Sequence, residues 1–339
     1  MARPYSVFVG DVALDEFFRA PAWPTAGTKM DITPVGTYVG GMIANAAAVY
    51  AGLGESVRFV WSMNDSDLTT RLLADLEQHG IDTSLVVRDD ALADSRNIIV
   101  LADGDHTVLT PALGLVTIDL TDAAVDALRG AQNVYTAIGD LRSLRHGGRG
   151  AGEVIADVRA AGARLVLDLD VAPLLPGDEA LVALADLLLV NRVGFERLRA
   201  GRSPEATVAA LLDGAASVVV VTLGAEGCRV HTRAGGFAVP GLPVEPVDVT
   251  GAGDTFGAAL VHALNVTDDL RAAAGFANAA ASRAVTLLGA RSGVAAHADV
   301  LAFMRAHGLP TDLPTSPTPD ADPAPGSPAA PPTTERHAT

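Results

Sequence analysis

Short apolar runs alternate along the chain with longer amphipathic or alanine-rich stretches. The short runs predict buried strands at residues 5–10, 57–62, 133–137, 164–168, 187–190 and 218–222. The longer stretches predict helices at residues 42–54, 66–79, 151–161, 179–185, 204–212, 253–264, 270–287 and 298–306. Strands that alternate with helices in this way are typical of a parallel sheet covered on both faces, so the pattern predicts an α/β domain.

The remaining β-rich segments predict a smaller unit beside this sheet. Residues 97–101 and 106–109 are joined by Ala-Asp-Gly-Asp, a hairpin signal, and residues 227–232 and 236–240 form a second predicted hairpin. Residues 12–39 alternate irregularly and contain three prolines, which favours short strands and turns over helix. We expect the small β unit to comprise about residues 13–38 and 97–109.

The composition changes at residue 310. Nine of the last thirty residues are proline, mixed with Ser, Thr, Ala and Asp, and no apolar period survives. Such a segment cannot bury enough apolar surface to offset its ordering entropy. The sequence therefore predicts one domain over residues 1–309 and a disordered tail over 310–339 whose removal leaves activity and melting temperature nearly unchanged.

Charge and composition exclude several functional classes. The chain of 339 residues is 49% hydrophobic and carries a net charge of −16, which disfavours nucleic acid and anionic membrane surfaces as partners. The single cysteine, Cys228, cannot form an internal disulfide, and the scattered histidines do not match a zinc motif. No signal peptide is recognisable and the apolar runs are too short to span a bilayer, so we expect a cytoplasmic protein.

The candidate chemistry centres on the stretch DVTGAGDTFGAAL, residues 248–260. A β-friendly run over 243–249 leads into a glycine-rich turn, and Gly251 and Gly253 let backbone N–H groups approach a ligand at the N-terminus of a helix. Asp254 lies in the first helical turn, where a carboxylate would repel a bound anion. It is better explained as a general base that takes a proton from a hydroxyl attacking phosphorus. The alternative is a tight turn with a capping carboxylate.

Other phosphate-binding loops do not fit this stretch. A Walker A loop requires Gly-Lys-Ser/Thr, whereas the only lysine of the chain, Lys29, is followed by Met30. A dinucleotide fingerprint would need a third glycine where Phe256 stands.

Residues 248–260 closely resemble the second signature of the ribokinase, or PfkB, family of carbohydrate kinases, and the resemblance extends over about residues 5–309. It implies a ribokinase-like three-layer α/β fold with a mostly parallel central sheet and a small β lid that closes over the sugar. It also implies ATP-dependent phosphorylation of a hydroxymethyl group, with ATP and Mg²⁺ as cofactors. Asp254 would be the catalytic base, and the backbone of Gly251, Ala252 and Gly253 would form the anion hole.

Two earlier segments resemble the sugar-binding part of the family. Gly40-Gly41-Met42-Ile43-Ala44-Asn45 is similar to the first signature, GGxxxN, and Asp15 matches a family aspartate that binds sugar hydroxyls. Two glycines allow a polyol to lie against the backbone, and an asparagine can both donate to and accept from vicinal hydroxyls. The alternative is an ordinary turn before a helix, with Asn45 on the surface.

The resemblance implies that ATP lies beside a further set of residues: Asn191, Thr222, Gly224, Gly227 and Asn278. Thr222 to Gly227 follow a predicted strand and are similar to the family turn TxGxxG, although a plain hairpin entry would have the same pattern. Asn278 falls where family members place a residue beside the adenine. The alternative for Asn278 is a solvent-facing position on an alanine-rich helix.

Two metal sites are implied with departures from the family pattern. Asp248, with the backbone near Thr250, Ala284 and Gly289, matches a loop that binds a monovalent cation such as K⁺, but Gly293 stands where some members have a serine ligand. 

A second departure concerns Mg²⁺. The family commonly has NxxE, whose glutamate organises Mg²⁺ through water, whereas this chain has Asn191 followed by Gly194. Glu196 lies two residues further on, which on a helix faces elsewhere. Mg²⁺ should still arrive on the ATP phosphates, but its outer shell must differ.

The pocket residues predict an unphosphorylated sugar. Met42 stands where family members often have a lysine, and Lys29 and Arg96 are the basic residues near the lid that we consider as possible anchors for a phosphate. Asp15 would repel a phosphate. A second phosphate normally calls for Arg or Lys in the pocket.

Two alternatives remain open at this point. A nucleoside kinase of the same family is favoured by the lid aromatics, which could stack on a base or could pack within the lid or at a dimer contact: Phe17, Phe18, Trp23 and Tyr38. A sugar-binding regulator without catalysis is favoured by the missing NxxE acid and disfavoured by the intact run 250–254. The resemblance also suggests a homodimer through the lids.

Overall fold

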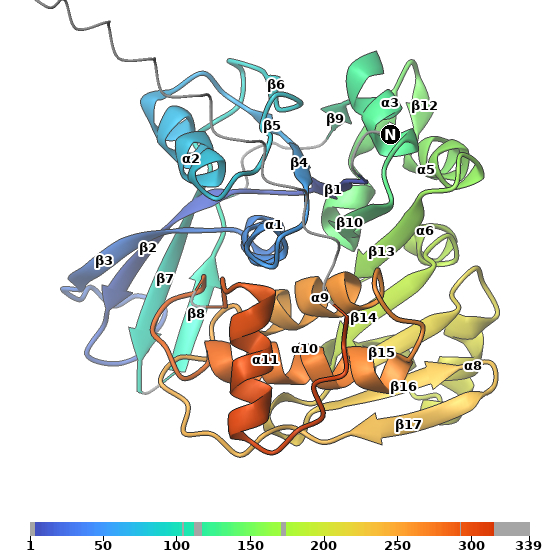
Figure 1. The fold of residues 1–339 in the computed structure, drawn as a ribbon. Coiled ribbons are helices and arrows are strands. Elements are labelled where there is room, and N and C mark those ends of the chain that lie inside the picture. Colours follow the sequence, from blue (N-terminus) through green and yellow to red (C-terminus); the bar gives the residue numbers. More distant parts are fainter. Residues whose placement is uncertain (1–3, 104, 112–116, 171–173, 292, 315–339) are drawn as a thin grey trace, which may run out of the picture.

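The computed structural model describes residues 4–103, 105–111, 117–170, 174–291 and 293–314. At its centre is an eight-stranded sheet with the order β17-β16-β15-β14-β13-β10-β1-β4 (Figure 1). Its strands are β1 (Ser6–Val9), β4 (Val57–Val60), β10 (Asn133–Ala137), β13 (Arg164–Asp168), β14 (Leu187–Asn191), β15 (Val218–Thr222), β16 (Cys228–Thr232) and β17 (Gly235–Val239). The strands from β4 to β15 pair in parallel, and β16 and β17 are antiparallel. The predicted α/β class with a mostly parallel sheet is confirmed.

Helices cover both faces of this sheet (Figure 1). One layer consists of α1 (Met42–Gly52), α9 (Ala252–Ala263), α10 (Leu270–Ala284) and α11 (His297–Ala306), which contact one another in that order. The other contains α3 (Asp122–Arg129), α5 (Ala151–Ala160), α6 (Asp178–Val182), α7 (Arg192–Arg199) and α8 (Pro204–Leu212). Alanine-rich α1 and α10 are buried along most of their length, because small side chains let them pack closely against α9.

A second sheet has the order β3-β2-β7-β8 and projects to one side of the central sheet (Figure 1). Its strands are β2 (Ala13–Arg19), β3 (Thr33–Gly40), β7 (Arg96–Ala102) and β8 (Asp105–Leu109). These strands lie within or close to the segments expected to form the small β unit. Its closure over a ligand stays a prediction.

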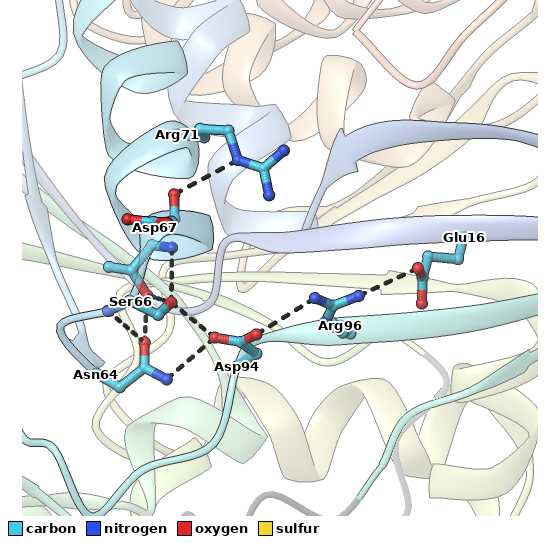
Figure 2. A network of polar contacts seen from close by, with 8 residues as sticks. Glu16, Asn64, Ser66, Asp67, Arg71, Asp94 and Arg96 are labelled. Atoms are coloured by element: carbon cyan, nitrogen blue, oxygen red, sulfur yellow. Dashed lines mark hydrogen bonds and ion pairs between the residues drawn. The ribbon is translucent and has the colours of Figure 1, made fainter.

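A polar network ties this second sheet to the start of α2 (Asp67–Gln78), as Figure 2 shows. The Asp94 carboxylate accepts from Asn64 Nδ2 at 3.1 Å and from Ser66 Oγ at 2.7 Å, and Ser66 caps α2. Arg96 donates to Asp94 at 3.3 Å and to Glu16 at 3.2 Å, which joins β7 to β2. Arg96 is thus held within this network.

The remaining elements are short. They are β5 (Ser62–Met63), β6 (Val87–Arg88), β9 (Ile118–Asp119), β11 (Leu144–His146), β12 (Arg149–Gly150), α4 (Ile138–Leu141) and the 3₁₀ turn Gly224–Glu226. The sequence pattern did not predict α3, α4 or α7, because these segments of eight, four and eight residues span about two helical turns at most and are short for a periodic signal to be recognised. No helix of the described segments combines the length and the apolar character needed to cross a bilayer.

The β-friendly run at 243–249 is not a strand. Pro243 and Pro246 lack backbone donors, and the side chains of Val247 and Val249 are 64% exposed. The segment is held instead by N–H groups of residues 247 and 248, which donate to the carbonyl of Val285.

The packed part of the chain continues beyond the expected boundary at residue 309. Leu313 is only 6% exposed and belongs to the main hydrophobic core. The domain therefore extends at least to this residue, and the expected tail over 315–339 lies outside the described residues.

Candidate active site

Polar side chains gather where the parallel strands end. Asp11 follows β1, Asp140 follows β10, Asp168 ends β13, Asn191 ends β14 and Thr222 ends β15. The register pairs residue 191 with residue 222 and residue 168 with residue 189, so these strand ends share one edge of the sheet. Ligands of open α/β sheets bind at this carboxyl edge.

The N-terminus of α9 lies at the same edge and faces a cavity. Gly251, the N-cap, has φ of 75°, and a Cβ there would lie 2.0 Å from the Ala290 carbonyl oxygen, so only glycine fits. Gly251, Gly253 and Asp254 line a cavity of about 450 Å³ together with Thr222. The Ala252 N–H donates to the Val249 carbonyl at 3.3 Å, whereas no hydrogen bond found among the described residues uses the N–H of Gly251 or Gly253, so these two donors of the expected anion hole are the ones available to a ligand.

Asp254 is half-buried in the first turn of α9, and its carboxylate accepts from Asn45 Nδ2 at 2.9 Å. Burial raises the pKa of Asp254 to about 8, against the lowering effect of the Asn45 hydrogen bond. The negative charges of Asp168, Asp170 and Asp11 raise the same pKa further. A carboxylate whose pKa lies near neutrality beside two open backbone donors is suited to accept a proton from an alcohol.

Asn45 is held in this orientation by Arg291. Arg291 Nε donates to Asn45 Oδ1 at 3.2 Å, which leaves the amide NH₂ to face Asp254. Arg291 is 12% exposed and forms an ion pair with Asp75 of α2. Asn45 therefore contacts the expected base directly. The sequence pointed to Asn45 but not to Arg291, which lies 246 residues away on a loop without a motif.

The two glycines before α1 are closely surrounded. A Cβ at Gly40 would lie 1.9 Å from Asp15 Oδ2, and one at Gly41, whose φ is 100°, would lie 2.6 Å from the Asp11 carbonyl oxygen. The glycines thus make room for Asp15 and for the chain after β1, and contact of a polyol with this backbone stays a prediction. Asp15 accepts from Asn97 Nδ2 at 2.8 Å, and burial raises the pKa of Asp15.

Two further carboxyl groups follow in sequence of contact, Asp11 near Asp15 and Asp140 near Asp11. Burial and the charge of Asp15 raise the pKa of Asp11 to about 6. Burial and the charge of Asp11 raise the pKa of Asp140 well above its usual value, and Asp140 Oδ2 would lie 2.7 Å from a Cβ at Gly10. The sequence carries no signal for Asp140, because this residue follows a predicted strand without belonging to any recognised motif.

The expected nucleotide residues are placed in two groups. Asn191, Thr222 and Gly224 line the cavity of about 450 Å³. Asn278 is only 5% exposed, so it is not the solvent-facing residue of the alternative reading, and its Nδ2 donates to the carbonyls of Val239 and Pro240 at 3.1 and 3.2 Å. Gly227 has φ of 91° and packs against the same backbone. An adenine beside Asn278 stays a prediction.

The expected cation loop is braced by Asp248. Its carboxylate accepts from the N–H groups of Thr250 and Gly289, both at 3.0 Å, and so joins the loop before α9 to the loop after α10, which begins beyond Ala284. A Cβ at Gly293 would lie 2.0 Å from Thr255 Oγ1, so the serine of some family members has no room here. Binding of K⁺ stays a prediction. Within the described segments, no three His, Cys, Asp or Glu side chains converge to hold a metal ion.

Known proteins are similar to this chain over most of its length. Ribokinase of Bacillus subtilis (strain 168) is 29% identical over 295 residues, which cover 84% of this chain and 94% of the relative. An ATP-dependent ribose-1-phosphate kinase of Halopiger xanaduensis is 29% identical over 301 residues, which cover 87% of this chain and 96% of the relative.

Solved structures share the fold. Arabidopsis thaliana ribokinase complexed with ribose and ATP matches with a TM-score of 0.76 at 23% identity, over 90% of this chain and 99% of that chain. A related Escherichia coli structure, a complex with ATP and Mg²⁺, matches with a TM-score of 0.71 at 19% identity, over 91% of this chain and 100% of that one. The model of the pfkB family carbohydrate kinases matches residues 4–296. The chain therefore belongs to the pfkB family of carbohydrate kinases.

Proposed function

We propose that the protein transfers the γ-phosphoryl group of ATP to a hydroxymethyl group of an unphosphorylated sugar. The observation that carries the proposal is Asp254, a carboxyl group with a pKa near neutrality in the first turn of α9, beside the open donors of Gly251 and Gly253. Asp254 accepts the alcohol proton as the oxygen forms a bond to the γ-phosphorus. The bond from this phosphorus to the bridging oxygen breaks, and ADP leaves. The backbone donors stabilise the charge on the transferred group.

The charges around Asp15 favour a neutral acceptor. Asp11, Asp15 and Asp140 are carboxyl groups, and the nearby guanidinium of Arg291 is paired with Asp75. Partly protonated carboxyl groups can donate to and accept from hydroxyl groups, whereas a phosphate dianion would be repelled. Arg96 is engaged by Glu16 and Asp94, and Lys29 is exposed on the segment between β2 and β3. Neither is a buried, unpaired cation of the kind that a second phosphate would call for.

The residues of the cavity fit the Mg²⁺ that accompanies ATP. Asp170 and Asn191 line the cavity with Gly251 and Gly253 and supply oxygen atoms, which Mg²⁺ prefers. Asp168 adds a third carboxyl or amide oxygen source next to them, since its carboxylate accepts from the Asp170 N–H at 2.9 Å. When bound, Mg²⁺ neutralises the phosphates during transfer. Since no three acidic side chains converge within the described segments, we propose that these groups contact the ion through its waters.

The test is a phosphorylation assay with MgATP and a panel of acceptors. Free pentoses and hexoses, their monophosphates and nucleosides are compared by catalytic efficiency at fixed ATP and Mg²⁺. We expect a free sugar to be preferred. A preference of tenfold or more for a monophosphate, such as ribose 1-phosphate, would contradict the neutral pocket and make Arg291 the suspected anchor. A preference for nucleosides would assign the lid aromatics to base stacking, and no turnover of any acceptor would contradict a kinase.

A further inference from the structure

The position where the family pattern has the NxxE glutamate has no room for a side chain in this protein. Asn191 caps α7 and accepts from the Gly194 N–H at 2.8 Å. A Cβ at Gly194 would lie 1.8 Å from the backbone carbonyl oxygen of Asp170, and well-ordered Cβ contacts are never this short. The backbone carbonyl of Asp170, just after β13, therefore occupies the space that a glutamate side chain at residue 194 would need.

That segment brings its own carboxylate to the same place. Asp170 Oδ1 accepts from Asn191 Nδ2 at 2.9 Å, and Asp170 lines the cavity of about 450 Å³ with Gly251, Gly253 and Asp254. Asp170 has φ of 38°, a positive value that few residues other than glycine, asparagine and aspartate adopt. Residues in such conformations cluster at functional sites, although Asp103 and Ala200 of this chain have positive φ away from the cavity.

Two of the described residues that line the cavity, Asp170 and Asp254, are acidic. Asp168, at the end of β13, is a third carboxyl group close enough to raise the pKa of Asp254. Arg192 also lines the cavity, but its guanidinium pairs with Glu226 at 2.5 Å and donates to the Leu223 carbonyl at 3.2 Å. A divalent cation carried on the nucleotide would balance this charge.

Glu196, the other acid near the motif, is placed elsewhere. Both of its carboxylate oxygens accept from Arg199 Nη1, at 2.9 and 2.6 Å. It lines a different cavity, of about 780 Å³, between α7, α8 and the strands β15 to β17. Glu196 therefore cannot take the place of the missing glutamate without leaving its partner.

We infer that the Asp170 carboxylate organises the water shell of the nucleotide-bound Mg²⁺, in place of the glutamate that Gly194 excludes. The inference rests on the proposed kinase function for the identity of the ion and its carrier. Asp170 acts as a positioning residue: it holds Asn191 and orients water on the metal, and it does not exchange a proton with the sugar.

The substitution Asp170→Asn removes the negative charge of this side chain and keeps its shape. Asparagine has the same size, tolerates positive φ and keeps an oxygen that can accept from Asn191. Glu196→Gln is the matched control, since it removes one acidic charge from the same motif region and lies outside the proposed site. Thermal unfolding of both variants checks folding, and we expect Asp170→Asn to melt at or above the wild-type temperature because it relieves repulsion between carboxylates.

The deciding measurement is calorimetric titration with a non-hydrolysable ATP analogue, with Mg²⁺ and with EDTA. We expect Asp170→Asn to bind the metal-free analogue as the wild type does, but to lose about 10–100-fold in the affinity gained from Mg²⁺, the usual effect of removing an outer-shell partner. The Mg²⁺ concentration needed for half-maximal ATP turnover should rise in parallel. Glu196→Gln should match the wild type in both measurements.

Several results would overturn the inference. These are an unchanged Mg²⁺ effect in Asp170→Asn, an equal loss of affinity with and without metal, or a loss of the Mg²⁺ effect in Glu196→Gln. The binding experiment is independent of the acceptor. A wild-type protein that binds the analogue with Mg²⁺ but phosphorylates no alcohol would contradict the proposed function, while the comparison of variants would still decide the role of Asp170.

Discussion

At the scale of a single residue, Asp254 is held in surroundings that disfavour its charged form and therefore reduce the stability of the fold. Its carboxyl group lies near three other carboxyl groups and one amide donor, and its pKa is raised to about 8. In the unfolded chain an aspartate has a pKa of about 3.9. The folded protein without ligands therefore keeps a proton on this residue across the neutral range. Only the ionised fraction of Asp254, which grows toward pH 8, can accept a proton from the alcohol.

We predict that Asp254→Asn lowers turnover by about 10²–10⁴-fold, the usual contribution of a general base. The same change should stabilise the fold. Above the unfolded pKa the unfolded chain ionises Asp254 and the folded protein does not, so this residue destabilises the fold increasingly between about pH 4 and pH 8. The variant should melt a few degrees above the wild type at pH 8, and the difference should vanish toward pH 4.

Steady-state kinetics and melting curves over this pH range check both parts. Asp268→Asn, at an exposed position between the C-terminal end of α9 and α10, serves as a control for the loss of an aspartate charge. More than a tenth of wild-type turnover in Asp254→Asn, or a variant less stable at pH 8 than the wild type, would contradict the assignment.

At the scale of elements, the loop between α10 and α11 connects three parts of the site. Gly289 donates to Asp248, the Ala290 carbonyl lies against Gly251, and Arg291 donates to Asn45. One loop thus braces the N-terminus of α9 and orients the amide on α1 that contacts Asp254. Arg291 is in turn paired with Asp75 on α2, so four elements define the position of one carboxylate.

We predict that Arg291→Gln shifts the acid limb of the pH profile of kcat/KM to higher pH. The guanidinium is a positive neighbour of Asp254, and its removal disfavours the ionised base. Arg291→Lys should restore part of the wild-type profile, because it keeps the charge and loses the hydrogen-bond geometry to Asn45. Arg71→Gln, on the exposed side of α2, is the control. An unchanged profile in Arg291→Gln, with only a lower melting temperature, would reduce Arg291 to a structural role.

At the scale of the whole molecule, the core extends beyond the segment with clear periodicity. Leu313 lies past the last helix, α11, and is nonetheless buried in the main core, to which Met304 and Val300 of α11 also belong. A single apolar residue among prolines and polar residues gives no periodic signal. Its burial depends on the surface that α11 and its neighbours form once they have packed.

We predict that truncation after residue 309 lowers the melting temperature by about 2–5 °C, because burial of one leucine contributes about 1.5–3 kcal/mol. Truncation after residue 314 should leave the melting temperature and turnover nearly unchanged, since the removed segment, 315–339, is rich in proline and polar residues. Differential scanning calorimetry of the two truncated proteins and of Leu313→Ala compares these effects. Equal melting temperatures for the three proteins and the full chain would show that Leu313 contributes little.

The sequence by itself determined the elements whose signal is local. The bounds of β10, β13, β15 and α8 were predicted to the residue, because buried β-branched runs and a Ser-Pro helix start are readable from a few neighbouring positions. The same holds for the long motif over 248–260, where glycines, a helix start and a carboxylate occur in unbroken order. It led to Asp254 and to the family without any structure.

Tertiary structure decided which side chains meet. The contacts of Asn45 with Asp254 and Arg291, the position of Asp140 beside Gly10, and the Asp170 carbonyl over Gly194 all join residues far apart in the chain. The residues next to them in the sequence form no pattern that predicts these contacts. The contacts arise only when the sheet forms and brings the ends of its strands to one edge. The raised pKa values have the same origin, since burial and the approach of other carboxyl groups exist only in the folded protein.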